Sequence, residues 1–464
     1  MHPLLAASLL EQAAALSRGE VSSRELVLAH LDRIERVNPL LNAVVATAAE
    51  AALAAADRAD RARARGRPCG VLHGVPMTIK DCLDTAGVAS TGGTLGRAGF
   101  VPERDATAVA RLRSAGAILL GKTNTPELTL YYDTVNLVHG RTLNPYDTAR
   151  SPGGSSGGAA AIVAACGAAF DLGTDTGGSI RLPAHFCGIA GLKPTSGRVP
   201  CTGLIIPPGS PVDAFTQIGP LARRVDDLYP ILRAIAGPDD VDTHAVPAPL
   251  RDPARVRVDR LRVAWYVDNG IAPATEPVRA VVEAAARALE SAGARVEERR
   301  PDGIEETASL YLRRFGTDGG AWVRRLLEQY GTARPFPFLR WARALDDQPA
   351  SAWTELLAST ETVCARMLRF MHLHDVLLCP AHAHAALPPD ELMSEERRPA
   401  FTWTQTWNVT GWPAGVVRAG VSEEGLPVGV QVVAKPWRED IVLAVMRQIE
   451  RWSGGWRAPA LAGD

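Results

Sequence analysis

The chain has 464 residues, of which 46% are hydrophobic, and its 50 basic and 51 acidic side chains leave a formal net charge of -1. A chain this long can bury a large core, and so small a net charge argues against a general attraction to nucleic acid or to an anionic membrane. The seven cysteines are odd in number and form no Cys-x-x-Cys pair, so we expect neither a disulfide framework nor a structural zinc site, and a reducing, cytoplasmic setting fits best.

The N-terminal segment is expected to form helices. Residues 4–20 lack a basic leader, and Glu11 interrupts their apolar run, so a surface-packed helix fits better than a signal peptide. Ser22 to Glu25 is a candidate start for a second helix, and the alanine-rich residues 48–64 are expected to form another. No run of about 20 apolar residues marks a membrane span.

Strand and helix patterns alternate in the middle of the chain. Residues 106–115 have the apolar spacing of a helix, and residues 117–120 form a short apolar strand directly afterwards. Residues 261–267 predict another strand, and the helix that follows has Thr275 as a candidate N-cap and Gly293 as its stop. Such alternation predicts an α/β sheet layered with helices.

Two longer segments differ from this pattern. Residues 238–259 are rich in Pro, Asp and Arg and are expected to form a surface connection. Residues 306–400 predict mainly helices, with several Trp and Phe side chains, and are candidates for a cap over a pocket. Length alone suggests about three domains at roughly 150 residues each, although large α/β folds often form one unit.

The most unusual stretch is 151–194. Two Gly/Ser clusters, 153–158 and 173–179, flank a helix-like apolar run at 159–165. Glycine lets backbone N–H groups approach a ligand closely, and a tight turn of such groups can stabilise a developing negative charge. Serine adds a hydroxyl that can act as a nucleophile. The residues with the composition for such a turn are Thr176, Gly177, Gly178 and Ser179.

Three other interpretations of these clusters compete. A flexible linker is the usual meaning of one Gly/Ser cluster, but two clusters that enclose an apolar run fit a linker poorly. A phosphate-binding loop needs a Lys directly after the cluster, and neither cluster has one. A Gly-x-Ser-x-Gly hydrolase elbow is not matched cleanly, because Ser155 and Ser156 stand together and the flanking glycines are misplaced.

A nucleophilic serine needs a base. His185 is close in sequence, but a packed or capping histidine is at least as good an interpretation. Lys80 ends a mostly apolar strand that begins near Gly74, and burial there would lower its pKa enough for it to act as a base. A lysine at a strand end is usually a solvated charge, so composition leaves the choice open.

Ordered motifs run along nearly the whole chain. They are Leu31-Asp32-Arg33-Ile34, Asn42-Ala43, Gly74-Val75-Pro76, Lys80-Asp81, Gly121-Lys122-Thr123-Asn124, the run 153–195, Gly197-Arg198-Val199, Gln217-Ile218-Gly219-Pro220, 408–413 and 426–431. By these motifs the sequence resembles the amidase signature family. Two positions depart from common family patterns, since Ala159 replaces a frequent Ser or Glu and Val417-Arg418 replaces a frequent Val-Pro. Both leave the catalytic positions intact and bear on substrate preference and local packing.

The resemblance implies a single large α/β unit over 1–464, with a central mixed β-sheet covered by helices on both faces. The signature core would span about 70–235, and a variable helical cap would span about 306–400. The implied activity is hydrolysis of a carboxylic amide without a metal or other cofactor. The implied partners are a small-molecule amide and, as an option, a second copy of the chain in a homodimer; nucleic acid and a membrane are not expected.

The implied machinery is a Ser–cis-Ser–Lys triad. Ser179 would be the nucleophile, Ser155 the bridging serine, and Lys80, neutral at rest, the base. The Gly154–Ser155 peptide bond would be cis, and Ser156 would support the hydrogen-bond network. The oxyanion hole would consist of the backbone N–H groups of Thr176, Gly177, Gly178 and Ser179, with Asp175 in support.

The residues that follow 121–124 line the acyl pocket in relatives, which makes Thr129, Leu130 and Tyr131 candidates for substrate contact. A core aromatic is an equally good interpretation of Tyr131. Further aromatic residues would either form an entrance or, for most of them, pack in the core. They are Trp322, Phe336, Phe338, Trp341, Trp403 and Trp407.

Two other functions stay open. One is the glutaminase subunit of a tRNA-dependent amidotransferase, which usually reads Tyr-Gly-Arg-Val-Ser-Arg-Tyr-Gly where residues 196–203 here read Ser-Gly-Arg-Val-Pro-Cys-Thr-Gly. That difference argues against such a subunit. The other is a catalytically inactive binding protein on the same scaffold, which the presence of all three triad residues disfavours.

Overall fold

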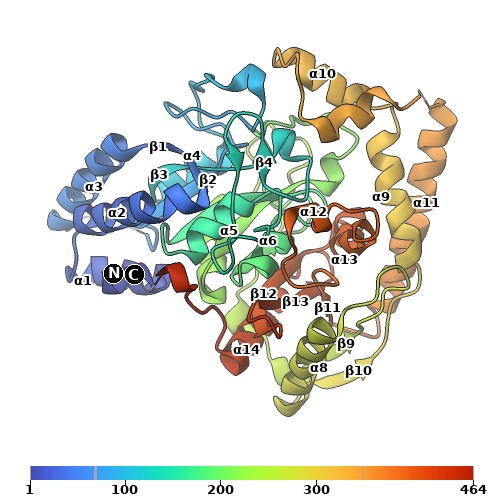
Figure 1. Ribbon diagram of the computed structural model, residues 1–464. Coiled ribbons are helices and arrows are strands. Elements are labelled where there is room, and N and C mark those ends of the chain that lie inside the picture. Colours follow the sequence, from blue (N-terminus) through green and yellow to red (C-terminus); the bar gives the residue numbers. More distant parts are fainter. Residues whose placement is uncertain (1, 67–69, 347, 463–464) are drawn as a thin grey trace.

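The structure, a computed structural model, describes residues 2–66, 70–346 and 348–462 (Figure 1). Its centre is an 11-stranded sheet. In spatial order the strands are β1 (Val44–Thr47), β3 (Ile118–Thr123), β2 (Pro76–Lys80), β6 (Phe170–Asp175), β8 (Gln217–Ala222), β7 (Ala190–Lys193), β12 (Ala414–Val421), β13 (Pro427–Ala434), β11 (Val376–Pro380), β9 (Arg262–Trp265) and β10 (Arg295–Glu298). A separate pair is formed by β4 (Val135–Asn136) and β5 (Gly140–Arg141).

The sheet is mixed. β3, β2 and β6 are parallel to one another, and so are β11, β9 and β10. Every pairing from β6 through β8, β7, β12 and β13 to β11 is antiparallel, as is the pairing of β1 with β3. The expected α/β class with a mixed central sheet is confirmed.

Helices cover both faces of this sheet. Side chains alternate along a strand, and in β3 Leu119 packs in one hydrophobic core while Ile118 and Leu120 pack in another. The first face carries α1 (Leu9–Arg18), α4 (Thr107–Ser114), α7 (Leu228–Ile235), α8 (Glu276–Ser291) and α14 (Glu439–Ser453). The second face carries α2 (Ser23–Leu41), α3 (Ala49–Ala64), α5 (Gly157–Ala164) and α6 (Arg181–Phe186).

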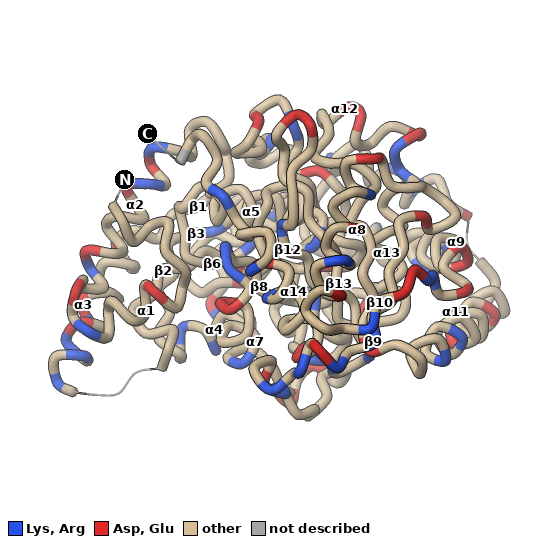
Figure 2. Tube along the Cα trace, turned by 90° about the horizontal axis from the view of Figure 1, so that it is seen from below, with Lys and Arg blue, Asp and Glu red and all other residues tan. Residues whose placement is uncertain are grey.

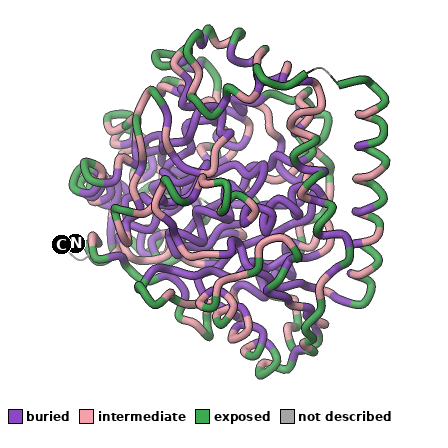
Figure 3. Tube along the Cα trace, turned by 45° about the vertical axis from the view of Figure 1, so that its right-hand side comes forward, coloured by how far each residue is buried: buried purple, intermediate pink, exposed green. Residues whose placement is uncertain are grey.

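The expected cap, 306–400, needs one correction. It is mainly helical, but it also contains β11, whose five residues are all buried and pair with strands on both sides. The helices that begin in or beside this region are α9 (Ile304–Gly316), α10 (Ala321–Gln329), α11 (Ala350–Phe370), α12 (Pro389–Leu392) and α13 (Thr402–Val409). α9 packs against both α11 and α13, and α11 stands at the edge of the molecule with much of its surface exposed (Figure 3).

Most of the elements predicted in the first half of the chain are present. α4 and β3 match the predicted helix and strand at 106–120, and α2 begins at a capping box formed by Ser22 and Glu25. Thr275 differs from expectation. It occupies the N-cap position of α8, but its hydroxyl donates to the carbonyl of Ala383 at 2.8 Å and caps nothing.

Basic and acidic residues are interspersed along the chain in the view of Figure 2. Of the seven cysteines, Cys69 lies outside the described residues, and the others carry free thiols. Over the ranges that the structure describes, no helix has the length and apolar character to cross a membrane.

Candidate active site

Lys80 is the last residue of β2 and is completely buried. Its Nζ atom lies 2.7 Å from Ser155 Oγ and 2.9 Å from Ser156 Oγ. The third neighbour is Thr174 Oγ1, at 2.8 Å, from the adjacent strand β6. Two parallel strands and the turn before α5 therefore bring four polar groups together inside the core.

The surroundings of Lys80 favour an uncharged amine. Burial lowers the pKa of Lys80 to about 8, against the opposing effect of Cys82, Asp175 and Asp171. A substantial fraction of the amine is therefore neutral near pH 8, as a proton acceptor must be.

The hydrogen bonds around the amine also give its lone pair a direction. Ser156 Oγ donates to the Thr174 carbonyl at 3.2 Å, so it has to accept a hydrogen from Lys80. A neutral amine has two hydrogens, and Thr174 Oγ1 can accept the second. With the two hydrogens on Ser156 and Thr174, the lone pair faces the hydroxyl of Ser155; in the protonated state the amine donates to all three hydroxyls.

The two Gly/Ser clusters lie side by side. The Gly154–Ser155 peptide bond is cis, as the resemblance implied. The N–H of Ser156 donates to the Ser179 carbonyl at 3.1 Å. Among the described residues no hydrogen bond joins the hydroxyls of Ser155 and Ser179, so only the Lys80–Ser155 part of the predicted proton path is formed. Catalytic hydrogen bonds often tighten only when substrate binds.

Asp175 organises the loop that carries Ser179. Its carboxylate accepts from the N–H of Gly178 at 2.8 Å and of Ile180 at 3.1 Å, and it pairs with Arg181 at 2.8 Å, with both side chains fully buried. Burial opposes ionisation, but the Arg181 guanidinium and hydrogen bonds from Arg181 and Asn408 outweigh it and hold the pKa of Asp175 well below its usual range.

Fewer backbone N–H groups are free for an oxyanion than the resemblance implied. The N–H of Gly178 is already engaged by Asp175, and the carbonyl of Gly177 accepts from Thr404 Oγ1 at 2.7 Å. The peptide between the two glycines is therefore held from both sides. Within the described ranges the N–H groups of Thr176, Gly177 and Ser179 have no acceptor, which leaves three donors for a developing oxyanion.

Comparison with known proteins identifies the family. A family model described as Amidase matches residues 25–443. The chain belongs to the amidase family. A relative 37% identical, over 94% of each chain, is a glutamyl-tRNA(Gln) amidotransferase subunit from Synechococcus sp. (strain CC9605). Another, 36% identical over 96% of this chain and 86% of its own, is the indoleacetamide hydrolase of Bradyrhizobium diazoefficiens. Among solved structures, 6-aminohexanoate cyclic dimer hydrolase complexed with substrate has a TM-score of 0.88 at 29% identity, over 99% of this chain and all of its own.

His185 is not available as a base in this member of the amidase family. Its Nδ1 accepts from the N–H of Gly429 at 2.8 Å, and its Nε2 lies 2.9 Å from the carbonyl of His384. Burial lowers the pKa of His185 to about 4, so the ring stays neutral with both nitrogens occupied. The packed histidine is the correct interpretation.

The candidate substrate residues lie in different surroundings. Thr129 and Leu130 are buried, and the ring of Tyr131 packs against Phe338 and Phe336 with centroids 4.6 and 5.5 Å away. The neighbouring Tyr132 ends the same stretch, and its hydroxyl borders Gly177. Gly177 belongs to residues 176–180, called the nucleophile loop because they include the candidate nucleophile Ser179. Of the other aromatic candidates, Trp322, Trp403 and Trp407 are core residues.

Sequence reasoning also missed the partners of Asp175. Arg181 donates to Gln431 Oε1 at 2.8 Å and to Asn408 Oδ1 at 2.5 Å, which ties the nucleophile loop to β13 and α13. One signal was present. Arg181 is a cation inside an otherwise apolar run two residues after Ser179, and a buried cation requires a paired anion.

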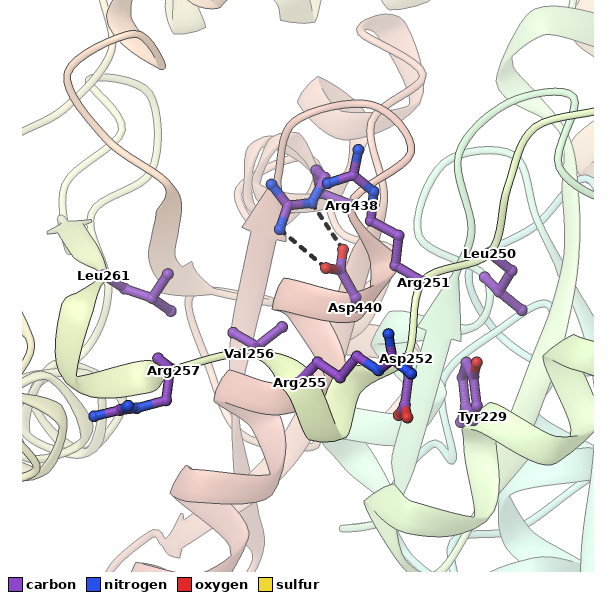
Figure 4. Close-up of a pocket in the computed structure, with 10 residues that line it drawn as sticks. All are labelled: Tyr229, Leu250, Arg251, Asp252, Arg255, Val256, Arg257, Leu261, Arg438 and Asp440. Atoms are coloured by element: carbon purple, nitrogen blue, oxygen red, sulfur yellow. Dashed lines mark hydrogen bonds and ion pairs between the residues drawn. The ribbon is translucent and has the colours of Figure 1, made fainter.

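A separate surface hollow of about 680 Å³ is lined by residues between Tyr229 and Leu261 together with Arg438 and Asp440 (Figure 4). Its lining includes Arg251, Arg255, Arg257 and Arg438 but no residue of the triad. Arg257 pairs with Asp259, and Arg438 pairs with Asp440. The lining of the hollow has no Ser, Cys, Lys or His side chain, so the buried cluster around Lys80 is the stronger candidate for an active site.

Proposed function

We propose that this chain is an amidase that hydrolyses a carboxylic amide to an acid and an amine or ammonia through an acyl-enzyme on Ser179. The observation that carries the proposal is the buried amine of Lys80, with its pKa lowered to about 8, 2.7 Å from the hydroxyl of Ser155. A lysine in that state is a base rather than a surface charge. Ser–Lys pairs are a known variant of triad chemistry.

In the proposed first half-reaction, the lone pair of Lys80 takes the proton of Ser155, and Ser155 takes the proton of Ser179. The Ser179 oxygen bonds to the amide carbon, and the carbonyl oxygen gains the negative charge. The free N–H groups of Thr176, Gly177 and Ser179 would hold that charge, and loss of one such donor typically costs about 3–4 kcal/mol.

The collapse of this tetrahedral species needs a proton at the leaving nitrogen, because an amide leaves poorly as an anion. The proton held by Lys80 returns through Ser155 to that nitrogen, the C–N bond breaks, and the amine departs. Water then attacks the acyl carbon while Ser155 takes one of its protons and passes its own to Lys80. The bond from the acyl carbon to Ser179 breaks, the proton held by Lys80 returns through Ser155 to the Ser179 oxygen, and the acid leaves.

A fluorophosphonate probe and mass spectrometry test this proposal directly. The intact chain should gain one adduct on Ser179, and Ser179→Ala should remain unlabelled. A panel of amides should give the acyl-enzyme mass on the peptide that contains Ser179. Absence of labelling in a folded wild-type chain would overturn the proposal and favour the inactive binding protein.

A glutaminase subunit is the second candidate, because a relative of that description is 37% identical to this chain. The residues at 196–203 differ from the usual motif of that subunit, which supports a free-standing amidase. The purified chain alone should hydrolyse simple aryl or alkyl amides faster than glutamine. Glutamine hydrolysis that appears only with added partner subunits would support the second candidate.

A further inference from the structure

Three polar side chains, of which Tyr311 and Gln405 are buried and Tyr132 is partly buried, form a hydrogen-bonded row beside the nucleophile loop. Gln405 Nε2 lies 2.7 Å from the hydroxyl of Tyr132, and that hydroxyl lies 3.3 Å from the hydroxyl of Tyr311. Each residue comes from a different part of the chain. Tyr132 lies just after the short 3-10 helix Glu127–Thr129, Tyr311 belongs to α9, and Gln405 belongs to α13.

The chemistry of the amide gives this row one direction. Gln405 Nε2 can only donate, so the oxygen of Tyr132 accepts. The hydrogen of Tyr132 is then directed to the oxygen of Tyr311. The hydrogen of Tyr311 has no acceptor among the described residues. The row therefore ends in a phenol whose O–H remains free to donate.

Both phenol rings are held in place. Tyr132 stacks on Phe401 with centroids 3.8 Å apart, and Tyr311 stacks on Phe215 with centroids 5.7 Å apart. Burial raises the pKa of Tyr132 to about 12 and that of Tyr311 well above its ordinary value. Both groups therefore remain protonated, and their hydroxyls have little freedom to move away.

The position of these hydroxyls connects them with catalysis. A Cβ atom placed on Gly177 would overlap the hydroxyl oxygens of both Tyr311 and Tyr132. Gly177 also carries one of the three N–H groups of the nucleophile loop that have no acceptor among the described residues. The unused O–H of Tyr311 is thus beside the point where the carbonyl oxygen of a bound amide would lie.

We propose that Tyr311 is a specificity-determining residue, whose free O–H donates to an oxygen acceptor that the substrate carries close to its scissile carbonyl. Gln405 and Tyr132 are positioning residues that hold the Tyr311 hydroxyl in the donating orientation. The preferred substrates are then amides with an ether, hydroxyl or carbonyl oxygen near the reacting group. This inference rests on the proposed amidase function and deepens it.

Matched pairs of amides test the inference. The anilides of methoxyacetic acid and butyric acid differ only by an oxygen in place of a methylene, and amides of 2-methoxyethylamine and butylamine make the same change on the leaving side. For each pair the readout is the kcat/KM of the oxygen compound divided by that of the hydrocarbon. This ratio should fall about fivefold in Tyr311→Phe for at least one pair, because one neutral hydrogen bond is lost.

The matched control is Tyr266→Phe, since Tyr266 is about as buried as Tyr311, stacks on Trp403 of α13, and within the described residues makes no hydrogen bond to the row. The ratio should not change in this variant. An unchanged ratio in Tyr311→Phe for both pairs overturns the inference while leaving the amidase function intact. A wild type that neither turns over an amide nor labels with a fluorophosphonate would instead remove the proposed function itself.

A second variant tests the direction of the row. In Gln405→Glu the carboxylate can only accept, so Tyr132 would donate to it and would accept the hydrogen of Tyr311. The Tyr311 ring remains, but its donor is consumed. The ratio should fall as in Tyr311→Phe, and the double variant should show no additional fall. Additive losses in the double variant would contradict the proposed direction.

Discussion

Lys80 Nζ and Ser155 Oγ lie 2.7 Å apart in the core, and the amine has its other two hydrogen bonds to Ser156 and Thr174. Within the described residues, no carboxylate pairs with this amine. Burial without a paired anion makes the charged form costly, which is the physical origin of the lowered pKa. The same arrangement would leave a protonated Lys80 unable to accept the hydrogen of Ser155.

The first prediction is a rate that rises with pH. Below its pKa of about 8 Lys80 is protonated and cannot act as a base, and above that value it is neutral. The kcat/KM for an amide should therefore climb tenfold per pH unit below about 8 and level off above it. Stopped assays from pH 5.5 to 10 measure this, with unfolding followed in parallel.

Lys122 provides the control for this assignment, because burial lowers its pKa to about 8 as well. It donates to Thr85 Oγ1 and Ser90 Oγ, and within the described residues it has no hydrogen bond to either candidate serine, Ser155 or Ser179. Lys122→Met should keep the apparent pKa of the rate profile even if stability falls. Lys80→Met should reduce kcat by at least a thousandfold at every pH. If Lys122→Met abolished the pH dependence of kcat/KM and Lys80→Met did not, the proposed role of Lys80 would be contradicted.

The second prediction concerns Asp171, which lies on β6 near the amine. Its charge raises the pKa of Lys80, and it accepts hydrogen bonds from Thr78 and Thr123 at 2.6 and 3.0 Å. Burial raises the pKa of Asp171 to about 6, so it is ionised where Lys80 titrates. Asp171→Asn keeps an acceptor oxygen but removes the charge. The pH step of kcat/KM should move to lower pH, and a shift upward would contradict this electrostatic account.

The candidate triad of Lys80, Ser155 and Ser179 came from the resemblance to the amidase signature family, whose motifs cover all three positions. Composition alone left the choice of a base open. The structure brings Lys80 and Ser155 together as expected. One of the implied oxyanion donors, the Gly178 N–H, is engaged by Asp175, and this contact depends on a carboxylate rotamer that no motif encodes.

Contacts between segments far apart in the chain could not be predicted from the sequence. Tyr311 reaches Gly177 across more than a hundred residues, and it does so because α9 packs on α13. Composition predicted a mainly helical region at 306–400, but it did not show that this region contributes β11 to the central sheet, between β13 and β9. A five-residue apolar run has no periodicity that distinguishes a buried strand from a helix segment.

The third prediction is a steric one at Gly177. Its backbone conformation is open to any residue, but an added methyl group would overlap the hydroxyls of Tyr132 and Tyr311. Tyr311 is buried, Tyr132 is partly buried, and both rings are stacked on a phenylalanine, so the loop rather than the rings should move. Gly177→Ala should lower kcat by about a hundredfold or more, since one displaced oxyanion donor has that effect.

Gly99→Ala is the matched control for this change, because a methyl group there meets nothing and the backbone is equally permissive. It should leave kcat within twofold. Thermal unfolding of both variants separates a displaced loop from general instability. Equal activity of Gly177→Ala and wild type would show that the loop tolerates the displacement and would remove Gly177 from the oxyanion hole.

The fourth prediction concerns the buried pair of Arg181 and Asp175. Removing the guanidinium in Arg181→Met leaves a carboxylate with no paired cation in the core, and breaking such a pair costs about 3–5 kcal/mol of unfolding free energy. Arg24→Ala, which breaks an exposed pair with Asp57, should cost less than about 1 kcal/mol. Urea unfolding at pH 7 measures both.

The pH dependence of that cost has a definite sign. In the wild type Arg181 holds the pKa of Asp175 below its unfolded value, so the pair stabilises the fold above the ordinary carboxyl range and this contribution is lost as the pH falls through it. In Arg181→Met burial would act alone and raise the pKa of Asp175, so ionisation would destabilise the fold as the pH rises. The stability gap between wild type and variant should therefore be smaller at pH 4 than at pH 7. A gap that does not change with pH would mean that packing, not charge, accounts for the loss.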